Sequence, residues 1–290
     1  METIPFFKKR YFLFGLIGFI ILVILIIIIV ASSGSGGLYL NLGVSTGVWW
    51  WNTSYDPNIY LPFLKKNGIT EIYIEDARFS EETSSFIKEA NSKNIKVFLL
   101  QGVKDWIFEH TELTEIIEKY RIFHKNYPNT KYSGLHLDVE PHQFEDFGER
   151  RVYYLEKYIQ FVYEIVNENP DITIDFDVPF WFHDEIEYNG QTKMAYKHLI
   201  DTGNRIFIMS YRDTAEAIVK CAIEELEYAK EKRKILFLCV ETKSSEGEHV
   251  SFQEDGKKVM YEELRKIGNI VNQTYGISIH QVKTWYDLQN

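Results

Sequence analysis

Short apolar runs rich in β-branched and aromatic residues alternate with longer segments of helical periodicity from Leu38 onward. Because each short run suits a strand and each longer segment suits a helix covering a sheet, this alternation predicts βαβ units and a parallel sheet. The predicted strands are Gly47–Trp51, Ile69–Glu75, Ile95–Gln101, Gly134–Glu140, Ile172–Pro179, Arg205–Tyr211, Ile235–Glu241 and Ile277–Gln281. The predicted helices include Asp56–Lys66, Glu81–Ser92, Glu112–Asn126, Gly148–Asn167, Thr214–Arg233 and Lys257–Gln273.

The number of these units predicts the fold class. Residues 38–290 are about as long as a typical single (β/α)8 barrel, which has roughly 250 residues, and eight strands close such a barrel. Since the chain ends soon after the eighth predicted strand, we expect the last outer helix to be missing or short. The alternative is an open doubly wound sheet, but no Gly-x-Gly-x-x-Gly turn follows an early predicted strand.

The first 37 residues have a different pattern. Residues 11–30 contain no charge, and a helix of about 20 such residues can cross a membrane. We predict an uncleaved signal-anchor there, with a cleaved signal peptide as the alternative. The basic tail 1–10 is expected in the cytoplasm, and the barrel domain 38–290 on the extracytoplasmic side. Residues 31–37 have the small polar composition of a flexible linker.

Charge and cysteine content narrow the choice of partners. The formal net charge is −10, so the surface repels phosphate backbones and nucleic acid is not an expected partner. The two cysteines, Cys221 and Cys239, fall in a helical and a strand pattern. They give no disulfide framework, and we expect both to be unpaired and buried.

The fourth predicted strand carries the strongest candidates for chemistry. Polar His136, Asp138 and Glu140 alternate with apolar residues in Gly134-Leu-His-Leu-Asp-Val-Glu-Pro-His142, so all three point into the barrel. Active sites of this fold form at the C-terminal strand ends. Crowding of two carboxylates raises the pKa of one, as a general acid near neutral pH requires. A buried ion-pair network that only stabilises the barrel is the alternative.

Polar and aromatic residues follow other strands as well. All six tryptophans lie at or beyond predicted C-terminal strand ends. Aromatic rings stack on sugar faces while carboxylates and amides bind hydroxyls, so we expect a carbohydrate substrate. The expected substrate-binding residues are His136, Trp50, Gln101, Asp177, Trp181, Asp213 and Trp285.

These motifs resemble the chitinase-like glycosidases. Gly134 to Glu140 is similar to that family's fourth-strand Asp-Gly-x-Asp-x-Asp-x-Glu, with Ser133 and His136 at the first two aspartates. Met209-Ser-Tyr211 resembles its Met-x-Tyr on the sixth strand, and Trp285 resembles the tryptophan ending the eighth. The resemblance implies that Glu140 is the general acid, that Asp138 orients the N-acetyl group acting as internal nucleophile, and that Tyr211 binds this group. Such substrate-assisted cleavage retains configuration.

A second resemblance is to retaining barrel glycosidases with glutamates on the fourth and seventh strands. It implies that Glu140 is the acid/base and Glu241 the nucleophile. Val139 stands where that clan usually has Asn. Neither glycosidase mechanism requires a metal or another cofactor.

Two other classes of function share the same residues. His136, Asp138, Glu140 and His142 alternate nitrogen and oxygen ligands, as in a metal-dependent hydrolase. A non-catalytic sugar-binding barrel would use the aromatic residues without needing an acid, but the presence of both Asp138 and Glu140 argues against it.

Overall fold

A computed structural model describes residues 38–244 and 247–289. Eight parallel strands form a closed barrel in the order β1-β10-β9-β8-β5-β4-β3-β2, which confirms the predicted (β/α)8 architecture. The barrel strands are β1 (Ser45–Trp50), β2 (Glu71–Ile74), β3 (Lys96–Gln101), β4 (Leu135–Leu137), β5 (Ile174–Pro179), β8 (Arg205–Met209), β9 (Leu236–Glu241) and β10 (Tyr275–His280).

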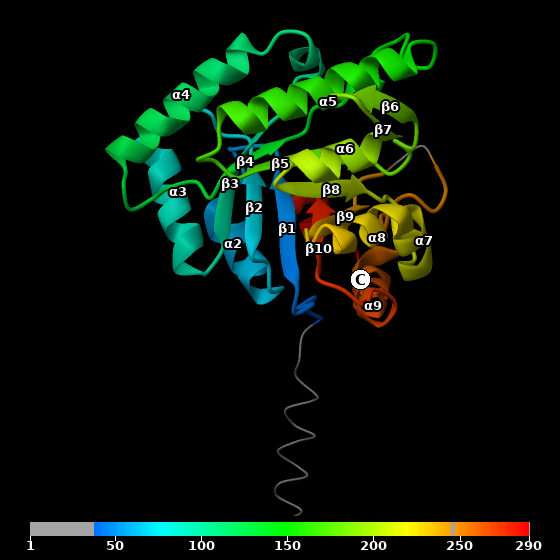
Figure 1. Ribbon diagram of the computed structural model, residues 1–290. Coiled ribbons are helices and arrows are strands. Elements are labelled where there is room, and N and C mark those ends of the chain that lie inside the picture. Colours follow the sequence, from blue (N-terminus) through cyan, green and yellow to red (C-terminus); the bar gives the residue numbers. More distant parts are fainter. Residues whose placement is uncertain (1–37, 245–246, 290) are drawn as a thin grey trace, which may run out of the picture. The chain divides into compact units, whose positions relative to one another are not determined.

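Helices surround these strands (Figure 1). They are α2 (Pro57–Lys66), α3 (Glu81–Ser92), α4 (Thr111–Asn126), α5 (Arg151–Glu168), α6 (Ala195–Thr202), α7 (Ala215–Cys221), α8 (Ile223–Glu231), α9 (Gly256–Ile270) and α10 (Val282–Asp287), with short 3-10 helices η1 (Lys104–Ile107) and η2 (Pro141–Gln143). The last helix after β10 is short, as predicted.

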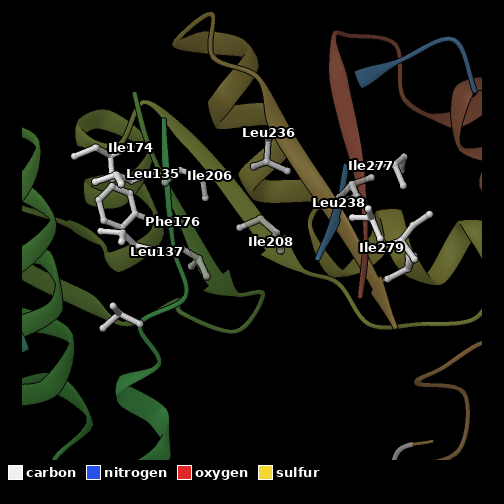
Figure 2. Packing of buried hydrophobic residues seen from close by; sticks show 14 of the residues in the cluster. Leu135, Leu137, Ile174, Phe176, Ile206, Ile208, Leu236, Leu238, Ile277 and Ile279 are labelled. Carbon is white, nitrogen blue, oxygen red and sulfur yellow. The ribbon is translucent and has the colours of Figure 1, made fainter. Parts of the chain in front are cut away.

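The main apolar core lies between the strands and these helices. Alternate strand residues point outward into it, because side chains of a strand alternate between the two faces of the sheet. Figure 2 shows such side chains from β4, β5, β8, β9 and β10. Those labelled are Leu135, Leu137, Ile174, Phe176, Ile206, Ile208, Leu236, Leu238, Ile277 and Ile279, each at most 3% exposed.

The opposite strand faces fill the barrel interior with a second, mainly aromatic cluster, made of Trp49, Tyr73, Phe98, Leu100, Phe207, Phe237 and Cys239. Glycine makes room for these rings. A Cβ on Gly47 would lie 2.1 Å from the hydroxyl oxygen of Tyr73, so this ring can occupy the centre only beside a residue without a side chain. The interior is therefore packed, and a pocket can open only at the strand ends.

Three details differ from the sequence predictions. The segment predicted as one helix, 214–233, is two helices that meet at Ala222. A two-stranded antiparallel hairpin, β6 (Glu185–Tyr188) with β7 (Gln191–Met194), was not predicted, nor was α6 after it. Cys239 is buried, but Cys221 is only half-buried; both are free.

The predicted membrane segment, residues 11–30, and the linker, residues 31–37, lie outside the described residues. Every helix of residues 38–244 and 247–289 is too short or too polar to cross a membrane.

Candidate active site

The C-terminal end of β4 presents the two candidate carboxylates. Regular pairing with β5 stops at Leu137, earlier than predicted, and the chain turns into η2 at Pro141, which has no N–H to continue a ladder. The alternation nevertheless continues beyond the strand, since Val139 is buried in the outer core while Asp138 and Glu140 line an internal pocket. The backbone N–H of Asp138 donates to the carbonyl of Gln101 (2.9 Å) and keeps this segment beside β3.

The pocket has a volume of about 350 Å³ and lies at the C-terminal ends of the strands. Its lining residues come from or follow six barrel strands, and two more come from η1 and η2: Trp51, Gly102, Lys104, Asp138, Glu140, Gln143, Met209, Tyr211, Glu241 and His280. A Cβ on Gly102 would lie 2.1 Å from the carbonyl oxygen of Asp138, so only glycine allows the chain after β3 to pass this close to the site. The pocket thus joins Glu140, Asp138, Tyr211 and Glu241, as the sequence predicted.

The protein environment favours the neutral forms of the carboxyl groups of Asp138 and Glu140, which follow β4. Burial raises the pKa of Asp138 well above its ordinary value, and the negative charges of Asp177 and Glu140 raise it further. Burial, together with Asp177, also raises the pKa of Glu140, to about 7. Gln143 donates a hydrogen bond to one oxygen of Glu140 and opposes part of this rise. Glu140 can therefore carry a proton near neutral pH, as a general acid must.

Asp138 has an oxygen without a protein partner. Its Oδ1 is buried and accepts no hydrogen bond within the described part of the chain. A buried polar atom left unpaired is costly unless a ligand supplies the partner. The phenol of Tyr211, which lines the same pocket, has a pKa raised well above its ordinary value by burial and by nearby acids, including Glu241 and Asp138. Its hydroxyl therefore remains a hydrogen-bond donor.

His136 lies deeper in the barrel, beneath these carboxyls. It is fully buried, and its Nε2 lies 2.7 Å from Oδ2 of Asp177, while its Nδ1 lies 3.6 Å from Asp175. Burial alone would lower the pKa of His136, but the two aspartates raise it to about 9. The ring stacks on Tyr73 with centroids 4.1 Å apart. His136 and Asp177 are thus an ion pair under the pocket, and they do not line it.

Glu241 is fixed by three donors. Its Oε1 accepts from the backbone N–H groups of Thr242 and Lys243, both at 2.7 Å, and its Oε2 lies 2.8 Å from Nδ1 of His280. Because the indole N–H of Trp51 donates to Nε2 of His280 (2.8 Å), the proton of a neutral His280 must be on Nδ1, directed at Glu241. Trp51 and His280 therefore orient this carboxylate.

Sequence reasoning did not select Trp51, His280, Lys104, Gln143 or Met209 as site residues. His280 and Met209 are the last residues of β10 and β8, so the rule that polar or functional residues occupy strand ends could have found them. Lys104 and Gln143 lie in η1 and η2, whose positions no sequence pattern predicts.

Four expected substrate-binding residues lie away from this pocket. Trp50 points outward and packs against Tyr60 and Phe86, because it alternates with the inward-facing Trp49 and Trp51. Trp285 is fully buried in α10 against Phe63. The remaining two are Gln101, whose amide donates to the carbonyl of Leu100, and Asp213, which accepts from Nδ1 of His249 at 2.8 Å. Most tryptophans therefore serve packing.

Trp181, the last expected residue, lines a neighbouring pocket beside the site. Its ring lies 5.5 Å from that of His142, whose Nε2 is 3.5 Å from Glu140.

The arrangement required for a metal-dependent hydrolase is not formed. Among residues 38–244 and 247–289, no group of three or more His, Cys, Asp or Glu side chains is arranged to hold a metal ion. The reason is geometric, since the ring of His136 is bound to Asp177 inside the barrel while His142 lies beyond the strand in η2.

Comparisons with known proteins identify the fold. No protein-family model matches the sequence, and no curated protein matches it. Among solved structures, the spore cortex-lytic enzyme SleL of Bacillus cereus has a TM-score of 0.50 at 12% identity, covering 83% of this chain and 71% of that chain. A putative chitinase A from Streptomyces coelicolor has a TM-score of 0.50 at 9% identity, covering 85% and 94%. The resemblance to chitinase-like glycoside hydrolases is thus confirmed at the level of the fold.

Proposed function

We propose that this chain is a glycoside hydrolase that acts on a glycan containing N-acetylhexosamine and retains configuration at the cleaved bond. The observation that carries the proposal is the burial of Glu140, which raises its pKa to about 7, beside the unpartnered oxygen of Asp138 in a pocket at the strand ends. The structurally similar proteins named a cortex-lytic enzyme and a chitinase support it, although only through their fold.

In this mechanism Glu140 gives its proton to the glycosidic oxygen while the carbonyl oxygen of the substrate's acetamido group attacks C1. The bond between C1 and the leaving oxygen breaks, and the positive charge passes to the acetamido group. The free Oδ1 of Asp138 accepts the acetamido N–H, and the hydroxyl of Tyr211 donates to its oxygen. Water, deprotonated by Glu140, then opens the cyclic intermediate and restores the acid.

A second candidate is the two-glutamate mechanism, because Glu241 lines the same pocket. There Glu241 would attack C1 directly. Its two oxygens already accept three hydrogen bonds. This arrangement is equally suitable for a carboxylate that binds sugar hydroxyls and for a nucleophile, so it does not favour the two-glutamate mechanism. We therefore place the substrate-assisted mechanism first.

Phenyl glycosides with and without a 2-acetamido group distinguish the two mechanisms. We expect the wild-type chain to cleave the 2-acetamido substrates, with Glu140→Gln reducing kcat about 100- to 10,000-fold, Asp138→Asn causing a large loss and Glu241→Gln a smaller one. If Asp138→Asn is harmless while Glu241→Gln abolishes turnover, the two-glutamate mechanism replaces this one. If no glycoside is cleaved, the enzymatic function itself is wrong.

The pH profile gives an independent test of Glu140. Because its pKa is about 7 and the acid must be protonated, kcat/KM should fall as the pH rises through about 7. An alkaline limb that persists unchanged in Glu140→Gln would assign the titrating group to another residue.

We also propose that residues 11–30 anchor the enzyme in a membrane, with the barrel on the extracytoplasmic side where glycan polymers are found. Their uncharged composition supports this. Separation of full-length protein into membrane and soluble fractions tests it, since deletion of residues 1–37 should release the barrel.

A further inference from the structure

A second pocket of about 580 Å³ opens beside the candidate active site. It is lined by Phe180 and Trp181 after β5, His183, Arg212 after β8, and Ala217, Lys220 and Cys221 of α7. Its walls therefore combine aromatic rings with two permanent cations, in a protein whose net charge is −10.

The two cations of this pocket are not neutralised by the protein. Neither Arg212 nor Lys220 forms an ion pair with a carboxylate of residues 38–244 or 247–289. By contrast Arg151, whose guanidinium lies 4.6 Å from the centroid of the Trp181 ring, is paired with Asp184 at 2.5 Å. The positive charge of the pocket is thus available to a ligand.

Two acidic residues near this pocket contact His183. Glu225 lies 2.8 Å from Nε2 of His183, and Glu224 lies 3.7 Å from its Nδ1. His183 therefore has its own carboxylate partners and serves as a wall of the pocket.

Arg212 is held in place for recognition. Its guanidinium lies over the ring of Phe180, 5.0 Å from the centroid, and one Nη1 hydrogen donates to the carbonyl of Tyr211 at 2.7 Å. The edge formed by Nε and Nη2 has no hydrogen-bond partner among the described residues. This edge is the one that binds a carboxylate through two parallel hydrogen bonds, and a guanidinium already held in position loses little entropy on binding.

The pocket is directly connected to the catalytic residues through the chain. Tyr211, which lines the active-site pocket, immediately precedes Arg212. On the other side, His142 stands between Glu140 and Trp181, 3.5 Å from the carboxylate and 5.5 Å from the indole centroid. A sugar chain cleaved at Glu140 would therefore place a neighbouring residue against Trp181 and Arg212.

We propose that this second pocket, hereafter the Arg212 pocket, binds a carboxylate carried by the glycan, so that the substrate is an acidic polymer containing N-acetylhexosamine. The aromatic side chains Phe180 and Trp181 supply flat surfaces for a sugar ring or its apolar substituent, and Arg212 with Lys220 binds the charge. This inference rests on the proposed glycosidase function and specifies its substrate.

The test measures binding to the full-length Glu140→Gln variant, whose kcat we expect to be at least about 100-fold lower than that of the wild type, so that its ligand stays intact during the measurement. The probes are tetra-N-acetylchitotetraose, which is neutral, and a hyaluronan tetrasaccharide, in which N-acetylglucosamine alternates with a sugar that carries a carboxylate. We expect the acidic tetrasaccharide to bind at least about 10-fold more tightly at low salt, with the difference shrinking as salt increases. Adding Arg212→Gln or, separately, the exposed Lys220→Gln should remove most of this preference.

Lys119→Gln is the matched control, because Lys119 is an exposed cation on the outer helix α4 and should leave the preference unchanged. Equal affinity for the two tetrasaccharides, or a preference that survives both pocket substitutions, overturns the inference while leaving the glycosidase proposal intact. Failure of both tetrasaccharides to bind speaks against the glycosidase proposal instead. Free glucuronate and inorganic phosphate are then compared as competitors of the acidic tetrasaccharide. If phosphate displaces it as effectively as glucuronate does, the pocket binds anions in general and the carboxylate assignment is wrong.

Discussion

Two pairs of carboxylates inside the same barrel have opposite surroundings. Near the N-terminal strand ends, Glu71 and Asp175 both bind Arg205, whose nitrogens lie 2.8 Å from the first and 2.5 Å from the second. At the C-terminal ends, neither Asp138 nor Glu140 forms an ion pair with a Lys or Arg of residues 38–244 or 247–289, and burial raises the pKa of each. The lower pair, Glu71 and Asp175, is neutralised by Arg205 and stabilises the barrel. Burial shifts the upper pair, Asp138 and Glu140, toward the protonated form, from which a proton can be donated.

His136 lies between these two pairs of carboxylates. It is paired with Asp177 and close to Asp175, so its positive charge compensates the acids between Arg205 and the pocket. The chitinase-like motif has an aspartate at this position. The replacement by histidine is therefore accommodated by the two aspartates of β5, which alternate inward on either side of Phe176.

The largest expected effect comes from removing the lower cation. Arg205→Met keeps apolar contact with the surrounding Phe98 and Phe237 rings but leaves Glu71 and Asp175 buried without their partner. We expect a loss of about 3–5 kcal/mol in the free energy of unfolding at pH 7. Urea denaturation measures it.

Lys93→Ala is the control for that experiment, because Lys93, directly after α3, forms a partly exposed ion pair with Glu89 that should contribute less than about 1 kcal/mol. Equal losses in the two variants would mean that the lower carboxylates do not depend on Arg205.

A smaller, pH-dependent effect is expected at His136. Its pKa is raised from 6.5 to about 9, so the charged ring stabilises the folded state below pH 6.5 and this contribution is lost as the pH rises through 9. The destabilisation caused by His136→Asn should therefore be larger at pH 7 than at pH 10, by on the order of 2 kcal/mol. Denaturation at both pH values measures the difference.

His124 provides the comparison, since burial lowers its pKa to about 4 and it is neutral at both pH values. The destabilisation caused by His124→Asn should not change between pH 7 and 10. If His136→Asn behaves in the same way, the ring of His136 is not an imidazolium.

The strands could be predicted from sequence more completely than the loops. Period-two alternation at His136, Asp138 and Glu140 predicted both the direction of these side chains and the position of the site, because the geometry of a strand fixes them. The same rule separates Trp50 from Trp51, yet the clustering of tryptophans at strand ends led to the selection of Trp50, which points outward, and not of Trp51, which lines the pocket. A tryptophan is large enough to fill the space beneath a helix, and proximity to a strand end does not distinguish the two roles.

The Arg212 pocket could not be predicted, because its residues come from two loops and α7. Trp181 and Arg212 lie far apart in sequence and meet only when β5 and β8 become neighbours, after the intervening β6–β7 hairpin and α6 leave the barrel. The same limit applies to the contact of Trp51 with His280, since these residues meet only when β1 closes the barrel against β10.

The smallest expected effect is a gain in stability at the upper pair. The pKa of Glu140 is raised from 4.5 to about 7, so its ionisation costs the folded protein nothing below pH 4.5, progressively more between pH 4.5 and 7, and a constant amount above pH 7. Glu140→Gln keeps the shape of the side chain and removes this cost. Because the Glu140 side chain is 21% exposed and solvent screens part of this cost, unlike at the fully buried His136, we expect the substitution to stabilise the protein at pH 8.5 by on the order of 1 kcal/mol, or a few degrees in Tm, and to have no such effect at pH 4.5. Glu149→Gln, at an exposed position, should change Tm at neither pH. The opposite result, destabilisation by Glu140→Gln at pH 8.5, would mean that the ionised carboxylate has a partner like those of the lower pair, and that Glu140 is a structural residue instead of an acid.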